Sequence, residues 1–92
     1  MYEPLVDPAA ISAVNQYFND LIAIADADEQ LPFLRPQVED FRFEVLNHNG
    51  MLSIQNQLRG FLWGLLVAGV LSPEQGRELS QRLEVGRQAG WL

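Results

Sequence analysis

Apolar side chains recur every three or four residues through the first part of the chain. They are Ile11, Val14, Phe18, Leu21, Ile22 and Ala25. This spacing places them on one face of an α-helix, with polar side chains on the opposite side. Asp7 and Pro8 form a typical helix start, because Asp7 can cap the first turn and Pro8 suits the first helical position. We therefore predict a helix over residues 8–28.

A proline-containing connector follows. Residues 31–36 hold two prolines, and the residue before a proline is biased away from helical geometry, so an extended segment is expected. Phe33 and Leu34 are expected to pack back under the core. The acidic run Asp26–Glu29 resembles the opening of a calcium loop but lacks the third ligand, the central glycine and the closing glutamate. We interpret it as the frayed acidic end of the first helix.

Residues 37–49 are compatible with two structures. In a helix that ends at Asn49-Gly50, the inward face would consist of Val38, Phe41, Val45 and Leu46. In a strand, Phe41 and Phe43 would alternate with charged residues, and Asn47–Gly50 would form a hairpin turn. The second structure gives an α+β fold with a β-hairpin at about 40–55. An isolated two-stranded ribbon is weak, so the helix is favoured and the β-hairpin is the alternative.

The last part of the chain predicts a helical hairpin. Ser53 is a candidate cap for a helix that reaches about residue 70. From Leu62 onward this helix is apolar nearly all round, so it is expected to be the central helix. Ser72–Gln75 then combines a cap, a first-turn proline and a glutamine that can complete a capping box. This start signal predicts a last helix over about 73–88.

Glycines lie inside both helices of this hairpin. The last helix carries a narrow seam made of Gly76, Leu79, Leu83, Gly86 and Gly90. Gly60 and Gly64 lie four residues apart in the preceding helix. Interior glycine destabilises a helix by up to about 1 kcal/mol, so we expect another backbone to approach closely, within the chain or between two copies. Trp91 and Leu92 either dock on the core or remain available to a partner.

These elements predict an all-α fold, a compact bundle of about four helices ending in an αα-hairpin, in a single helical domain over residues 1–92. Apolar residues make up 48% of the chain, which argues against disorder. There is no cysteine, which excludes disulfides and thiol chemistry. The N-terminus lacks a signal-peptide pattern, and the apolar run Gly60–Leu71 is too short to span a bilayer. We expect a soluble, cytoplasmic protein.

Charge is distributed unevenly along the chain. Residues 1–50 hold nine acidic residues and two arginines, a net charge of −7, whereas residues 51–92 hold three acidic residues and four arginines, a net charge of +1. An acidic surface attracts basic partner surfaces and repels nucleic acid. The candidate partner-binding residues are Asp20, Asp26, Asp28, Glu29, Glu39, Asp40 and Glu44. The alternative is that these acids only keep a small protein in solution.

No pattern in the sequence points to catalysis, a metal or a cofactor. His48 is the single histidine and lies at an expected helix end or turn, without recognisable catalytic or metal-binding partners. The last helix follows a tight turn as in a helix-turn-helix, but it carries three acidic residues beside its three arginines. A chain charge of −6 also lacks the basic footprint of a nucleic-acid-binding protein. We expect no enzymatic activity, no cofactor, no direct nucleic-acid binding and no membrane partner.

The chain is short, acidic and free of cysteine, and it ends in a hairpin built around Gly64–Glu74. In size, charge and hairpin it resembles small phage-encoded anti-defence proteins of the anti-CRISPR type. The resemblance includes no diagnostic motif, so it assigns no functional residue. It implies a non-enzymatic inhibitor that binds a host protein with a basic surface stoichiometrically. The alternatives are a self-associating assembly protein, for example a homodimer formed through the glycine seam and Trp91-Leu92, and a weak helix-turn-helix DNA-binding regulator.

Overall fold

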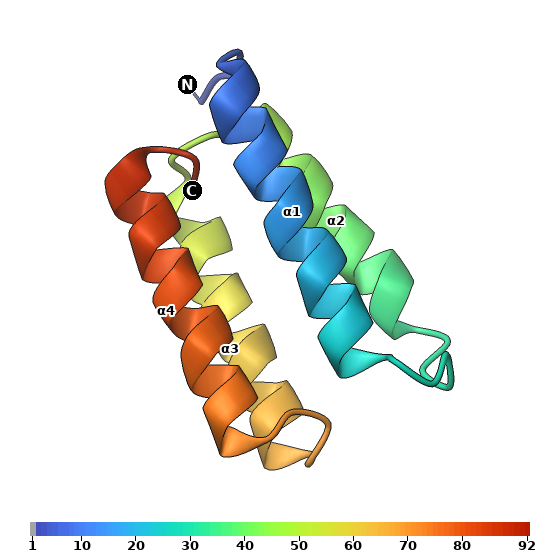
Figure 1. The fold of residues 1–92 in the computed structure, drawn as a ribbon. Helices are drawn as coiled ribbons and strands as arrows, with labels where there is room; N and C mark the ends of the chain where they lie inside the picture. Colours follow the sequence, from blue (N-terminus) through green and yellow to red (C-terminus); the bar gives the residue numbers. More distant parts are fainter. Residues whose placement is uncertain (1) are drawn as a thin grey trace.

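The computed structural model describes residues 2–92 and shows a bundle of α-helices (Figure 1). The helices are α1 (Pro8–Ala25), α2 (Leu34–Asn47), α3 (Leu52–Val67) and α4 (Pro73–Ala89). The described residues contain no strand, so the predicted all-α bundle is confirmed and the alternative β-hairpin at about 40–55 is wrong. The helix is favoured there because its inward positions reach the common core, which an isolated ribbon could not cover as well.

The main helix contacts are those of α1 with α2 and of α3 with α4, and smaller contacts of α4 with α1 and of α2 with α3 join the two pairs. Figure 1 shows α1 beside α2 and α3 beside α4, with both termini at one end of the bundle. The α1–α2 loop and the α3–α4 turn lie at the opposite end. The expectation that α3 is central is wrong, because Trp63 and Val67 on its outer side are 65% and 69% exposed.

The core is filled from all four helices, with the largest share from α1. Val14, Tyr17, Phe18 and Leu21 of α1 are fully buried. They pack with buried side chains of the other helices and connections, including Val38, Val45, Leu58, Leu62, Leu71, Leu79 and Leu83. Burial of these apolar groups is the main stabilising contribution in a domain of this size.

Two helix starts differ from the sequence-based prediction, and α1 and α3 end earlier than predicted, at Ala25 and Val67. α2 begins at Leu34, so Pro36 lies inside the first helical turn rather than in an extended connector. A proline is tolerated there because the first N–H groups of a helix have no partner within it. α3 begins after Met51, and Ser53 does not cap it. The cap predicted at Ser53 is therefore wrong.

Both ends of α4 are closed by specific interactions. The capping box predicted at its start is confirmed: the backbone N–H of Gln75 donates to Ser72 Oγ at 3.1 Å, and Gln75 Oε1 accepts from the Ser72 N–H at 2.9 Å. At the other end Gly90 adopts a left-handed φ of 88°, which turns the chain back. Trp91 and Leu92 are consequently buried, and the Trp91 indole lies directly against Gly86.

Candidate protein-binding site

The α1–α2 loop is held together by the side chain of Asp26. Its Oδ1 accepts hydrogen bonds from the backbone N–H groups of Gln30, at 2.8 Å, and Leu31, at 3.1 Å. Helix α1 ends at Ala25, and Glu29 has a left-handed φ of 55°. The segment is thus a hydrogen-bonded turn rather than the frayed helix end expected from the sequence. Asp26 has a structural role that Asp28 does not share.

An apolar groove of about 390 Å³ lies beside this loop. It is lined by Leu31, Pro32, Phe33, Leu34, Gln37, Phe61, Leu65 and Val70. These residues come from the α1–α2 loop, the start of α2, one side of α3 and the α3–α4 turn. Phe33 is 85% exposed, so the expectation that it packs under the core is wrong, whereas Leu34 is buried as expected. The first turn of α2 directs Leu34 inward and leaves Phe33, at the N-cap, outside.

The apolar groove and the acidic loop are contiguous. Leu31 and Val70 also line a hollow of about 280 Å³ that contains Asp26 and Asp28. Leu31 further borders a hollow that includes Glu29. We call the groove residues together with Asp26, Asp28 and Glu29 the loop-end site. It lies at the end of the bundle opposite the two termini (Figure 1).

The other four predicted partner-binding residues lie elsewhere. Asp20 forms an ion pair with Arg82 of α4 at 3.0 Å. Glu44 accepts from His48 Nδ1 at 2.6 Å, one turn further along the chain. Asp40 is exposed on α2. The structure therefore brings Asp26, Asp28 and Glu29 together in one loop, while Asp20 faces a different helix pair.

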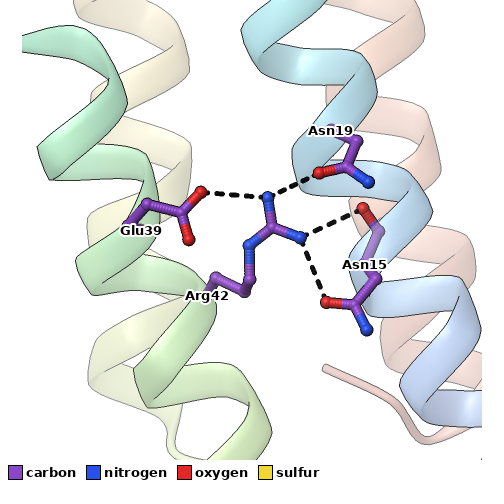
Figure 2. Close-up of polar contacts among 4 residues, drawn as sticks. All are labelled: Asn15, Asn19, Glu39 and Arg42. Atoms are coloured by element: carbon purple, nitrogen blue, oxygen red, sulfur yellow. Dashed lines mark hydrogen bonds and ion pairs between the residues drawn. The ribbon is translucent and has the colours of Figure 1, made fainter.

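Glu39 belongs to a network centred on Arg42 (Figure 2). Arg42 Nη2 donates to Asn19 Oδ1 at 2.7 Å and to Glu39 Oε1 at 3.1 Å. Its Nη1 donates to Oδ1 and to the backbone oxygen of Asn15, at 3.0 and 3.4 Å. The guanidinium also lies over the Phe18 ring, 5.9 Å from its centroid. Because the network joins α2 to α1, Glu39 contributes to helix packing.

Asp20 is likewise part of an internal cluster. Its partner Arg82 lies over the ring of Tyr17, 5.2 Å from the centroid. The Tyr17 hydroxyl donates to the backbone oxygen of Leu79 at 2.9 Å, which connects α1 to α4. Burial raises the pKa of the Tyr17 phenol, and the nearby Arg82 charge opposes that change in part. The Asp20 carboxylate stabilises this helix contact by holding Arg82 in place.

Asp28, Glu29 and Asp40 make no ion pair with any described residue. Of the seven candidates they are the ones whose charge is not engaged in the fold. Sequence reasoning missed the apolar groove beside two of them. A signal for it existed in the charge-free segment Leu31–Leu34, because Pro32 within it and Pro36 after it argue against the helical period that would direct all its apolar side chains to one side.

Within the described residues 2–92, no group of three or more His, Asp or Glu side chains is positioned to hold a metal ion. None of the described helices has the length and apolar character required to cross a membrane. Comparison of the chain with protein-family models, curated proteins and solved structures found no significant match.

Proposed function

We propose that the chain is a non-enzymatic protein-binding module that uses the loop-end site. Its partner segment would carry an apolar anchor with basic side chains beside it. The observation that supports this function is the position of exposed Phe33 in an apolar groove that shares its walls with the acidic loop. The groove can remove an apolar side chain from water, and Asp28 and Glu29 can attract neighbouring lysines or arginines.

The resemblance to small phage anti-defence proteins extends the proposal to a class of target. The target would be a host defence protein whose basic surface binds nucleic acid, and the module would inhibit it by occupying that surface. The net charge of −7 in residues 1–50 supports this extension. An acidic protein competes with phosphate backbones for the same lysines and arginines.

The proposal can be tested by capture of the partner from the native host, followed by quantitative binding. A tag on the N-terminus is suitable because it lies far from the loop-end site, whereas Leu92 is buried (Figure 1). We expect the double reversal Asp28→Lys/Glu29→Lys to weaken binding at least about tenfold, mainly through the association rate. Phe33→Ser should weaken it mainly through the dissociation rate. Asp26 is left unchanged because it holds the loop.

The matched control is Glu74→Lys/Glu78→Lys, which reverses two exposed acids on α4 with the same change in net charge. This control should bind nearly as well as the unchanged chain. Affinity for the partner should also fall as salt rises, because opposite charges are screened. A captured partner whose affinity is insensitive to the loop reversal and to Phe33→Ser would show that the loop-end site is not the binding surface.

A further inference from the structure

The outer side of α3 carries an apolar face that no other part of the described chain covers. Leu52, Trp63 and Val67 are 63%, 65% and 69% exposed. At 100° per residue they fall within one sector of the helix, together with Gly60 and the exposed polar residue Asn56. We call Leu52, Gly60, Trp63 and Val67 the α3 outer face. It points away from Phe61 and Leu65, which border the loop-end site on the other side of the same helix.

A groove of about 260 Å³ between α3 and α4 continues this face. Its lining consists of Arg59, Leu62, Trp63, Leu66, Pro73, Gly76, Arg77 and Ser80. Trp63 thus belongs both to the outer face and to the wall of the groove. A large aromatic side chain in this position is typical of an interface centre, where it can lose its remaining contact with water.

The glycines beside Trp63 have no role in the packing of the single chain. A Cβ atom added at Gly60 or Gly64 would meet nothing within 4 Å. At Gly76, in contrast, the added atom would lie 3.3 Å from the Leu66 side chain. Glycine inside a helix is destabilising, so two glycines on an open helix surface are not explained by the fold. They leave a shallow recess next to the exposed indole.

We infer that a second copy of this chain covers the α3 outer face and forms a symmetric homodimer. The uneven distribution of charge favours a second copy as the partner and α3 as the surface through which the copies meet. Residues 1–50, which form α1 and α2, carry −7, whereas residues 51–92, which form α3 and α4, carry +1. Two copies that meet through α3 bring nearly neutral layers together. Their acidic layers then lie on the outside, with the α3–α4 layers of both copies between them, and a single helix of about 10 Å diameter already exceeds the Debye length of about 8 Å at physiological salt.

The shape of the face is also suited to its own copy. In a two-fold symmetric dimer both copies use the same surface, so each contact between two different residues occurs twice in the interface. Trp63 projects beside the recess at Gly60 and Gly64, and the two-fold places each indole against the partner's recess. The glycine seam of α4 cannot serve this purpose, because Leu66 covers Gly76 and Trp91 covers Gly86 within the chain. The dimer predicted from that seam and Trp91-Leu92 is therefore replaced by one through α3.

The test is the mass of the purified protein in solution, measured by sedimentation velocity over a wide concentration range. We expect a concentration-dependent species of twice the 10.4 kDa chain mass. Trp63→Glu should shift the midpoint of dimerisation at least tenfold upward in concentration, and Gly60→Leu should do the same by filling the recess. Gly60→Leu should still raise the melting temperature of the dilute monomer, because it removes an exposed helical glycine. Phe43→Glu is the matched control, since it adds the same charge at an aromatic side chain that is 59% exposed on α2.

Several results would overturn the inference. They are a chain that stays monomeric at every concentration, a dimer unaffected by Trp63→Glu, or equal disruption by Phe43→Glu. Salt separates this inference from the proposed function. Raising salt from about 0.01 M, where the Debye length is about 30 Å, to physiological strength should strengthen the dimer, because it screens the repulsion between two copies of charge −6. The same change should weaken binding of a basic partner. Loss of dimerisation also leaves the loop-end site intact, so either proposal can fail without the other.

Discussion

At the scale of single residues, two glycines inside helices differ in whether a neighbour lies where a side chain would be. Gly86 lies against the Trp91 indole so closely that a Cβ atom would overlap the ring. Gly64 has open space on its outer side. The sequence shows both as interior helical glycines and predicts close approach at each. Only the return of the chain at Gly90, which places Trp91 over α4, decides which glycine is required.

This difference predicts opposite effects for the same substitution. Gly86→Ala should lower the free energy of unfolding by about 1–3 kcal/mol, because Trp91 must move from a well-packed position. Gly64→Ala should raise it by up to about 1 kcal/mol, because alanine is the better helix former and meets no neighbour. Chemical denaturation of dilute protein measures both values. A stabilising Gly86→Ala would contradict the packing of Trp91 described above.

The acidic residues show the same limit of sequence reasoning. Asp26 and Asp28 are two positions apart in a run of similar composition. Only Asp26 accepts hydrogen bonds from the backbone of the loop. Asp20 pairs with Arg82, which lies far away in sequence, and Glu39 pairs with Arg42, one helical turn away. Local sequence identifies acidic residues, but tertiary packing determines which of their charges remain available to a partner.

At the scale of elements, the hydrophobic period predicted all four helices. The prediction failed where the result depends on how the helices pack against one another, or where a residue is compatible with two local structures. From Leu62 onward α3 is apolar nearly all round, yet only the side facing α2 and α4 is covered, because four helices in a ring leave each with an outer face. The predicted start of α2, after Pro36, is too late, since proline is compatible with the first turn of a helix as well as with a connector.

Of the two predicted serine caps, Ser72 is confirmed and Ser53 is wrong, and this contrast can be tested directly. Ser72→Ala should lower the free energy of unfolding by about 1 kcal/mol, because the Gln75 N–H loses its acceptor and the capping box is broken. Ser53→Ala is the matched control and should change it by no more than about 0.5 kcal/mol, since Ser53 is exposed and caps nothing. Thermal and chemical unfolding of the two variants would show the contrast. Equal losses would mean that the start of α3 is misassigned.

At the scale of the whole molecule, the bundle is closed by the contact between α1 and α4, and Tyr17 lies at its centre. The Tyr17 ring packs against Phe18 and Trp91, with centroids 5.3 and 5.7 Å away, and its hydroxyl donates to the Leu79 carbonyl. The chain has no cysteine, its six basic residues are all arginine, and it has two tyrosines. Arginine stays protonated, so Tyr17 is the buried side chain that can lose a proton at alkaline pH.

Stability at alkaline pH should therefore report on the closure of the bundle. In the unfolded chain a tyrosine ionises near pH 10, whereas burial raises the pKa of Tyr17 in the folded state. The unfolded state then binds fewer protons than the folded state above about pH 10, so the free energy of unfolding falls as pH rises further.

Tyr17→Phe should be less stable at neutral pH by about 1 kcal/mol, through loss of the hydrogen bond to Leu79, but should show little of this alkaline decline. Tyr2→Phe, at a half-exposed position, should retain the decline. Denaturation curves recorded between neutral pH and about pH 12 provide the measurement. A decline that persists undiminished in Tyr17→Phe would show that the phenol is not buried between α1 and α4.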